Sequence, residues 1–156
     1  MNRRYLSNTE VQGLLMEVIR QQAVRNFTPA AIVAPIRGGL QLGVMLSHYF
    51  EVPVYPVEVR LRDGDGLINY RDIEQQFKRA WSHGDVLVMD DINDSGNTIN
   101  TLKEFTTQIP LAGETRYAVL LDKLSSRAEV DFQGELVGED REHEWVVFPW
   151  EEWWAR

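Results

Sequence analysis

The sequence has no cysteine, and this absence excludes disulfide bonds, thiolate nucleophiles and cysteine-ligated zinc. It also has no apolar run long enough to cross a membrane as a helix. Positive charge is scarce, since 16 Lys and Arg are outnumbered by 24 Asp and Glu, which gives a net charge of −8. A nucleic-acid partner is therefore not expected, because neutralising a phosphate backbone requires clustered basic residues. The histidines have no metal-ligand spacing, and we interpret them as structural or exposed: His48, His83 and His143.

What is present suits one globular domain. The 156 residues are 44% hydrophobic, which is enough for a sizeable core. We predict a single domain over 1–156, with a core over about 27–125 and a small cap over about 126–156. Arg3 and Arg4 are not followed by an apolar segment of signal-peptide length, so we expect a soluble, cytoplasmic protein that binds no membrane. Small phosphorylated ligands remain compatible with its acidity, because local loops and metal ions can bind them.

Helical and extended patterns alternate along the chain. Ser7-Asn8-Thr9-Glu10 has the form of a capping box and predicts a helix near 8–25. Further helices are predicted after 39 and after 98, and residues 62–82 are predicted to be a long polar loop. The predicted strands lie at 31–34, within 52–61, and at 86–89, 117–121, 132–137 and 145–148. This alternation predicts an α/β fold with a mostly parallel sheet flanked by helices, and ligands at the carboxyl ends of its strands. The loops expected at that edge are 35–39, 90–98 and 122–127.

The most informative segment of the sequence is 86–98. An apolar strand is followed by Asp90 and Asp91, and burying an unpaired carboxylate is expensive, so both should lie at the exposed carboxyl end of the strand. A short polar loop then leads into the next predicted helix. Backbone N–H groups at a helix start, joined by hydroxyl groups, form a cradle for a phosphate. The residues of this loop are Asp94, Ser95, Gly96, Asn97 and Thr98.

This segment resembles the phosphoribosyl pyrophosphate (PRPP) motif of type I phosphoribosyltransferases, which is an apolar run, two acids, two variable residues and Asp-Thr-Gly-x-Thr. The sequence departs from that motif by Ser95, where Thr is common, and by Asn97, where Gly is frequent. The resemblance implies that Asp90 and Asp91 contact the ribose hydroxyls and that residues 94–98 bind the 5′-phosphate. It also implies that Asp94 lies near the base, where its carboxylate is the candidate catalytic proton acceptor.

Two other interpretations of this segment remain open. Asp-Ser-Gly-Asn-Thr is also ordinary turn and N-cap chemistry, so the segment is compatible with a plain crossover and a capped helix. An acid pair at a strand end with a later lysine is also similar to response-regulator receiver domains. There the pair follows the first strand, whereas here a predicted strand and a helix already lie upstream.

A second loop carries the same resemblance. Ile36-Arg37-Gly38-Gly39 is similar to the pyrophosphate loop of the family, often Ser-Arg-Gly-Gly in its xanthine-guanine members. Two glycines let the backbone approach an anion closely, and Arg37 offers five donors and a permanent charge. The resemblance implies that Arg37, Gly38 and Gly39 bind pyrophosphate. In the family the peptide bond before this arginine can be cis, which sequence does not determine. A Gly-Gly turn with a surface arginine is the structural alternative.

The purine branch of the family is indicated by the end of the chain. Residues 145–151, Trp-Val-Val-Phe-Pro-Trp-Glu, resemble the ending of xanthine-guanine and archaeal purine phosphoribosyltransferases. The resemblance implies that Lys123 contacts the exocyclic oxygen of a 6-oxopurine, that Trp145 stacks on the base, and that the Val146 backbone reads its edge. The other tryptophans are interpreted as anchors of the tail or as oligomer contacts: Trp150, Trp153 and Trp154.

Together these features predict transfer of the 5-phosphoribosyl group from PRPP to guanine, xanthine or hypoxanthine, giving a nucleoside monophosphate and pyrophosphate in purine salvage. The resemblance implies Mg²⁺ as cofactor, bound by Asp90 and Asp91 directly or through ribose hydroxyls or water. It also implies a homodimer or homotetramer, and it places residues 62–82 where the family has a flexible loop that closes over PRPP. The alternatives are a non-catalytic PRPP-sensing regulator and a phosphoribosyltransferase for a non-purine base.

Overall fold

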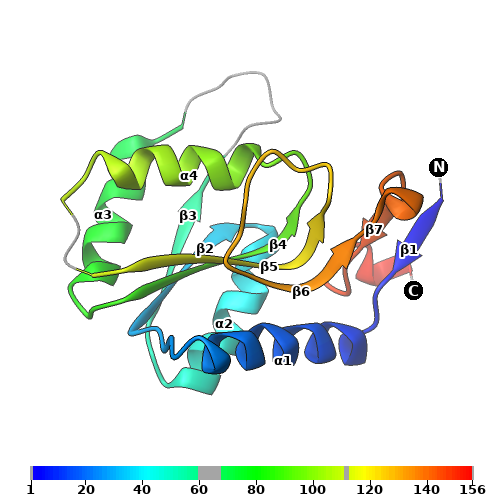
Figure 1. Ribbon diagram of the computed structural model, residues 1–156, viewed down its shortest axis with the longest axis horizontal. Helices are drawn as coiled ribbons and strands as arrows, with labels where there is room; N and C mark the ends of the chain where they lie inside the picture. Colours follow the sequence, from blue (N-terminus) through cyan, green and yellow to red (C-terminus); the bar gives the residue numbers. More distant parts are fainter. Residues whose placement is uncertain (1, 60–67, 111–112, 156) are drawn as a thin grey trace.

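The structure is a computed structural model that describes residues 2–59, 68–110 and 113–155. A five-stranded sheet forms its centre, with the strand order β3-β2-β4-β5-β6 and every neighbouring pair parallel (Figure 1). The strands are β2 (Ala31–Ile36), β3 (Val54–Glu58), β4 (Val86–Asn93), β5 (Thr115–Lys123) and β6 (Phe132–Val137). The predicted strands are thus confirmed wherever they fall on described residues.

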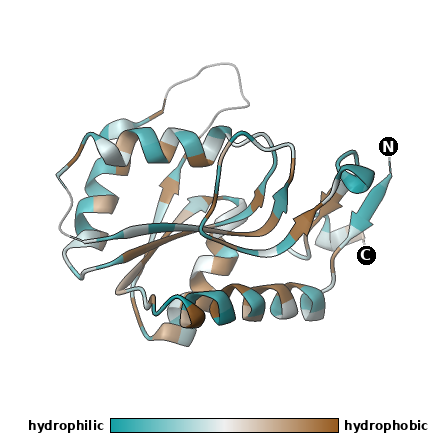
Figure 2. Ribbon diagram, in the orientation of Figure 1, coloured by the Kyte–Doolittle hydropathy of each residue, from teal (hydrophilic) through white to brown (hydrophobic). Residues whose placement is uncertain are grey.

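Two helices cover each face of this sheet. Helices α1 (Asn8–Val24) and α2 (Gly38–Phe50) pack on one face, and α3 (Tyr70–Trp81) and α4 (Asn97–Thr107) pack on the other (Figure 1). Figure 2 shows hydrophobic residues concentrated in the strands, while the helices mix hydrophobic and hydrophilic residues. A hydrophobic core therefore forms on each side of the sheet. The predicted α/β architecture is confirmed.

Helix α1 begins as its capping box predicts. The Ser7 backbone N–H donates to Glu10 Oε2 at 2.7 Å, and the Glu10 backbone N–H donates to Ser7 Oγ at 3.2 Å. Val11, Leu15 and Val18 follow on the buried side of the helix. Burial of each such side chain stabilises the fold by roughly 1.5–3 kcal/mol.

The prediction of a polar loop over 62–82 is wrong for the part that the structure describes, because α3 occupies it. The Asn69 side chain caps this helix by accepting from the Asp72 backbone N–H at 3.1 Å. Its charged residues hide an apolar stripe at helical spacing, which packs under β2 and β3 and consists of Ile73, Phe77, Ala80 and Trp81. The rest of the predicted loop and the end of the strand predicted within 52–61 lie outside the described residues.

A second, two-stranded sheet joins the two ends of the chain. Strand β1 (Arg3–Tyr5) pairs in parallel with β7 (Trp145–Val147), and both lie beyond β6 at one end of the molecule (Figure 1). Two short 3-10 helices accompany them, η1 (Glu139–Arg141) and η2 (Trp153–Ala155). Arg4 on β1 makes a bidentate ion pair with Glu135 on β6, at 3.0 and 2.8 Å. This pair ties the small sheet to the edge of the large one.

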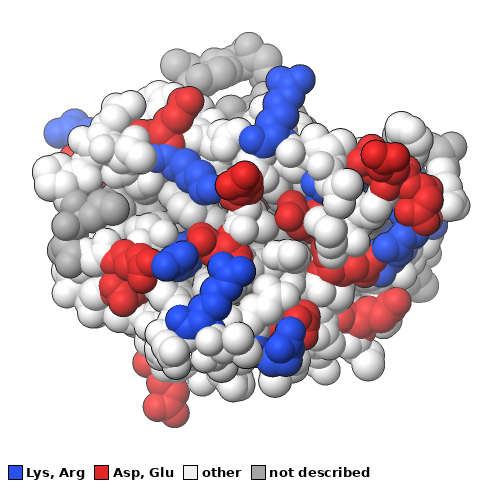
Figure 3. All heavy atoms as spheres, viewed as in Figure 1, with Lys and Arg blue, Asp and Glu red and all other residues white. Residues whose placement is uncertain are grey.

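Charge is distributed evenly on the face drawn in Figure 3. There, basic and acidic side chains are interspersed, and no broad basic patch forms. Among the described residues, no helix is long and apolar enough to cross a membrane.

Candidate active site

Strand β4 runs four residues past its predicted end at Met89, so the acid pair lies inside the strand. It pairs with β5 through Asp90 and Val119 and continues to Asn93 and Asp122. Asp90 is only 7% exposed, and Asp91 is partly buried. The expectation of an exposed strand end is therefore wrong for Asp90, because continued pairing with β5 holds this carboxylate in the sheet.

Burial makes the carboxyl groups of Asp90 and Asp91 weaker acids than usual. It raises the pKa of Asp90 well above its ordinary value, and repulsion from Asp91 adds to the effect. Burial likewise raises the pKa of Asp91 to about 6, with a further contribution from Glu151. Backbone N–H groups oppose these shifts, since the Asp91 N–H donates to Asp90 Oδ1 at 2.9 Å and the Ile92 N–H to Asp91 Oδ1 at 2.8 Å. Hydroxyl donors or a cation at this point would relieve the remaining cost.

The start of α2 packs against the acid pair because two glycines occur there. A Cβ atom added to Gly38 would overlap the Asp91 carboxylate, and one added to Gly39 would overlap the backbone oxygen of Met89. Arg37 precedes them as an exposed residue, and the Ile36–Arg37 peptide bond is cis. The predicted pyrophosphate loop thus lies next to the predicted ribose-binding carboxylates, with the N-terminus of a helix behind it.

The loop from Asp94 to Thr98 leads directly into α4. Gly96 is its N-cap residue, with a φ of 85°, and an added Cβ would press on the backbone nitrogen and Cβ of Ala128. Ser95 and Asn97 are exposed, and the Asn97 backbone N–H is 3.4 Å from Ser95 Oγ. The N–H groups of a first helical turn have no partner within the helix. The loop therefore has the geometry of an anion site.

Lys123 joins this loop from β5. Its Nζ lies 2.7 Å from Asp94 Oδ1 and donates to the backbone oxygen of Glu142 at 2.9 Å. The lysine side chain is only 11% exposed, so its charge is stabilised chiefly by these two partners. The structure thus brings together two residues that the sequence separates by 29 positions, both of them predicted to face the base.

Trp145 and Val146 lie on β7, shortly after Glu142, whose backbone oxygen accepts a hydrogen bond from Lys123. The Trp145 side chain is 45% exposed, and Val146 is partly buried against the core. The Trp145 backbone N–H donates to the Asn2 backbone oxygen at 2.8 Å, which fixes the strand while the side chain stays partly exposed. Glu142 lies three residues before Trp145, and its hydrogen bond with Lys123 joins the segment before β7 to β5.

Three polar residues of the site were not predicted from the sequence. Asn93, at the end of β4, is 1% exposed and hydrogen-bonds to Asp122 on β5 and to Ser126 beyond it. Burial raises the pKa of Asp122, which the Asn93 bond partly offsets. The sequence does indicate these residues indirectly, because polar residues follow an apolar run on both β4 and β5, and the two strands pair in the fold.

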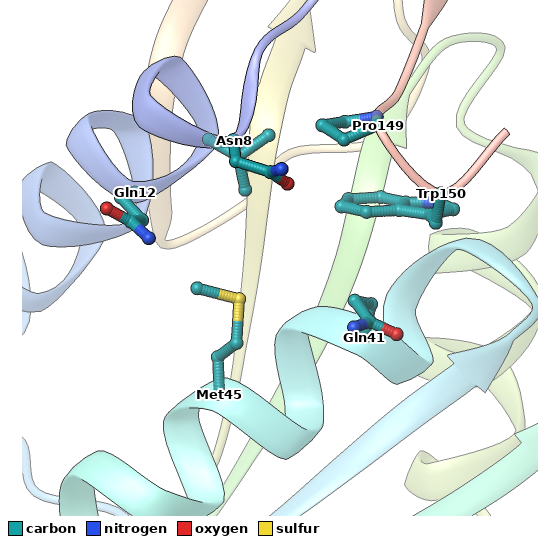
Figure 4. A pocket seen from close by; sticks show the side chains of 7 residues that line it. Asn8, Gln12, Gln41, Met45, Pro149 and Trp150 are labelled. Atoms are coloured by element: carbon teal, nitrogen blue, oxygen red, sulfur yellow. The ribbon is translucent and has the colours of Figure 1, made fainter. Parts of the chain in front are cut away.

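The tail leaves a cavity of about 250 Å³ away from these residues. It lies between α1, α2 and the segment after β7, and Figure 4 shows Asn8, Gln12, Gln41, Met45, Pro149 and Trp150 around it. No predicted base, phosphate or ribose contact lines this cavity. Trp150 stacks on Phe148 with ring centroids 5.0 Å apart, which supports its interpretation as an anchor. Trp153 and Trp154 are largely exposed and do not anchor the tail in the core.

The carboxylates suit a metal ion that arrives with a substrate. Within residues 2–59, 68–110 and 113–155, no three acidic or imidazole side chains converge on one point as a metal cage would require. Asp90 and Asp91 are adjacent oxygen donors whose burial disfavours two negative charges. Such a pair fits hydrated Mg²⁺, which uses few protein ligands and binds substrate oxygens.

A parallel sheet with paired carboxylates and a polar loop at the carboxyl ends of its strands is an α/β architecture in which ligands bind at that edge. The model of the phosphoribosyl transferase domain matches residues 5–155, and the chain belongs to this family. No curated protein matched the sequence.

Solved structures give the same fold. Purine phosphoribosyltransferase from Pyrococcus horikoshii is 24% identical, with a TM-score of 0.74 and coverage of 97% of this chain and 95% of that one. Xanthine-guanine-hypoxanthine phosphoribosyltransferase from Helicobacter pylori is 22% identical, with a TM-score of 0.74 and coverage of 99% and 97%. Orotate phosphoribosyltransferase from Aeropyrum pernix is 18% identical, with a TM-score of 0.51 and coverage of 90% and 68%.

Proposed function

We propose that the protein transfers the 5-phosphoribosyl group of PRPP to N9 of a 6-oxopurine, releasing pyrophosphate and a nucleoside monophosphate. The observation that carries this proposal is the position of Lys123, held between Asp94 and Glu142 beside the anion loop. A partly buried ammonium group there suits an exocyclic oxygen on a base. The likeness to structures of purine enzymes supports the same choice.

The donor half of the reaction falls to the ends of β2 and β4. The amides and hydroxyls of 95–98 bind the 5′-phosphate, and Asp90 and Asp91 accept from the ribose hydroxyls. Arg37 and the Gly38-Gly39 amides bind the pyrophosphate. As the bond from the anomeric carbon to pyrophosphate breaks, negative charge grows on the leaving group, and these fixed donors stabilise it.

The acceptor half falls to Lys123, Asp94 and Trp145. The ammonium donates to the exocyclic oxygen of the purine, and the partly exposed indole of Trp145 stacks on the ring. As N9 attacks the anomeric carbon, the purine loses a proton, and Asp94 is the carboxylate placed to accept it. The Lys123–Asp94 ion pair holds the two side chains together before the base binds.

Mg²⁺ is part of this proposal, because two adjacent carboxyl groups supply oxygen atoms of the kind that this ion prefers. Asp90 and Asp91 would hold it through ribose hydroxyls or water, and it would supply positive charge against the pyrophosphate oxygens.

A panel of six bases tests the proposal. The protein is mixed with PRPP and Mg²⁺ and with guanine, xanthine, hypoxanthine, adenine, uracil or orotate, and both pyrophosphate and nucleotide are measured. We expect turnover with one or more 6-oxopurines and none with uracil or orotate. Turnover with a pyrimidine instead would assign a different base, and PRPP binding without any turnover would assign a sensor.

A matched variant sharpens the panel. Lys123→Met keeps most of the length of the side chain and removes its charge. We expect it to weaken the binding of 6-oxopurines about tenfold or more while PRPP affinity stays within threefold. An equal loss for both substrates would remove Lys123 from base recognition.

A further inference from the structure

Asn93 is a buried amide with all of its hydrogen-bonding groups in use. It is 1% exposed at the last position of β4. Its Nδ2 donates to Asp122 Oδ1 and to the backbone oxygen of Ala128, both at 2.8 Å, and its Oδ1 accepts from Ser126 Oγ at 2.8 Å. A buried amide satisfied in this way holds its partners in one arrangement, because any shift would leave a polar group unpaired.

Two of these bonds fix the segment that supports the anion loop. Ser126 and Ala128 are the residues against which Gly96 packs without room for a Cβ. The same segment is joined to the loop by the Arg127 backbone N–H, which donates to the Ser95 oxygen at 3.4 Å. Asn93 therefore helps to set where this loop lies relative to β5.

The third bond fixes the base side. Asp122 directly precedes Lys123 on β5, and Asp94 directly follows Asn93, just past the end of β4. Lys123 and Asp94, which form the ion pair, are therefore the sequence neighbours of Asp122 and Asn93, which form the hydrogen bond. One side chain connects the two parts of the site.

We propose that Asn93 is a positioning residue that sets the spacing between the 5′-phosphate loop and the Lys123–Asp94 pair, and so the affinity for a nucleoside 5′-monophosphate. This inference rests on the proposed function and deepens it. A monophosphate occupies both parts of the site at once, whereas PRPP uses the loop without the base side. Asn93 itself touches neither ligand.

The substitution Asn93→Leu tests this inference, because it keeps the size of the side chain and removes all three bonds. We expect the Kd for inosine or guanosine monophosphate to rise at least tenfold, and the Kd for PRPP with Mg²⁺ to rise less than threefold, both by calorimetry. Thr106→Val is the matched control, since it removes a buried hydroxyl bonded at 3.0 Å to Tyr117 between α4 and β5, outside the site. The control should leave both affinities within twofold.

A reciprocal exchange supplies the rescue. Asn93→Asp alone places two carboxyl groups face to face and should weaken monophosphate binding at least tenfold. Adding Asp122→Asn restores one donor between the strands, and Ser126 still donates to position 93, so affinity should recover at least threefold from that of Asn93→Asp. It should stay below the wild-type affinity, because the bond to the Ala128 oxygen is not restored. If Asn93→Leu does not fold, Ser126→Ala should show the same pattern with a smaller loss of about threefold.

The outcomes separate the two claims. If the wild type binds monophosphate and PRPP but the Asn93 variants weaken both equally, or behave like Thr106→Val, the positioning role is overturned and the proposed function stands. A double variant that regains thermal stability without affinity also overturns it. A wild type that binds no nucleoside monophosphate overturns both.

Discussion

The first half of strand β4 is fully buried and the second half is buried in part, and burial has opposite effects on the two. Val86–Met89 are apolar and fully buried, so removing them from water stabilises the fold by roughly 1.5–3 kcal/mol per large side chain. Asp90 and Asp91 follow on the same strand, and burial there raises their pKa values. Each unit of such a shift costs about 1.4 kcal/mol when the group is charged.

The first half of β4 therefore serves the stability of the fold, and we propose that the second half serves binding. The first half of β4 packs into both hydrophobic cores. The second half has the start of α2 against it and ends at the fully bonded Asn93. A strained polar segment held by its neighbours is what a binding site for hydroxyls, phosphate and a cation requires.

The largest expected effect comes from Asp91→Asn, which removes a charge from the second half. We expect activity to fall about 10²–10³-fold, since a group aimed at the reacting sugar is lost. The pKa of Asp91 is about 6 in the folded protein and 3.8 ordinarily, so the folded state binds the proton more tightly. The free energy of unfolding therefore falls as pH rises from 3.8 to about 6, and the whole loss is present above pH 6. The variant should therefore be more stable than the wild type at pH 8 by about 1–2 kcal/mol.

Urea unfolding at pH 4 and pH 8 measures that stability. The gain should be present at pH 8 and largely absent at pH 4, where both proteins carry an uncharged group. A variant that is less stable at pH 8 would show that the carboxylate supports the fold instead of straining it.

Leu87→Ala makes the opposite change in the first half. We expect the free energy of unfolding to fall by about 3 kcal/mol, because a fully buried side chain leaves a cavity. Activity per folded molecule should stay within twofold at a temperature where the variant is folded. Denaturant titration and steady-state kinetics check this. A large loss of kcat would show that the first half of β4 also contributes to activity.

Asp94→Asn tests the loop that follows the strand. We expect kcat to fall about 100-fold, because the amide cannot accept the purine proton. The Kd for PRPP should stay within threefold, since the loop amides remain. Single-turnover kinetics with calorimetry separates the two quantities. Near-normal turnover would remove Asp94 from the chemistry.

Trp145→Ala probes β7, which lies in the small second sheet, and should have the smallest effect. We expect KM for the purine to rise about tenfold through the loss of stacking, with Trp145→Phe recovering most of it. The free energy of unfolding should change by less than about 1 kcal/mol, because the side chain is 45% exposed. A drop in stability with unchanged KM would make Trp145 a structural residue.

The sequence allowed a prediction of site residues chiefly where those residues are contiguous. Asp90 to Thr98 and Arg37 to Gly39 are contiguous, so their residue types and order could be interpreted without a structure. Helix α3 was missed because charged residues dilute its apolar stripe to a low average hydrophobicity. The burial of Asp90 and the bonds of Asn93 depend on pairing with β5, about 30 residues away in the chain, and no local pattern records it.

The most direct test of the whole account is calorimetric titration of PRPP with Mg²⁺ at pH 7 into the wild type, Asp91→Asn and Leu87→Ala. The account predicts saturable binding to the wild type, the same affinity within twofold for Leu87→Ala, and binding to Asp91→Asn that is weaker by about 100-fold. Absence of binding to the wild type, or equal affinity in Asp91→Asn, would contradict the claim that the polar half of β4 is the binding site.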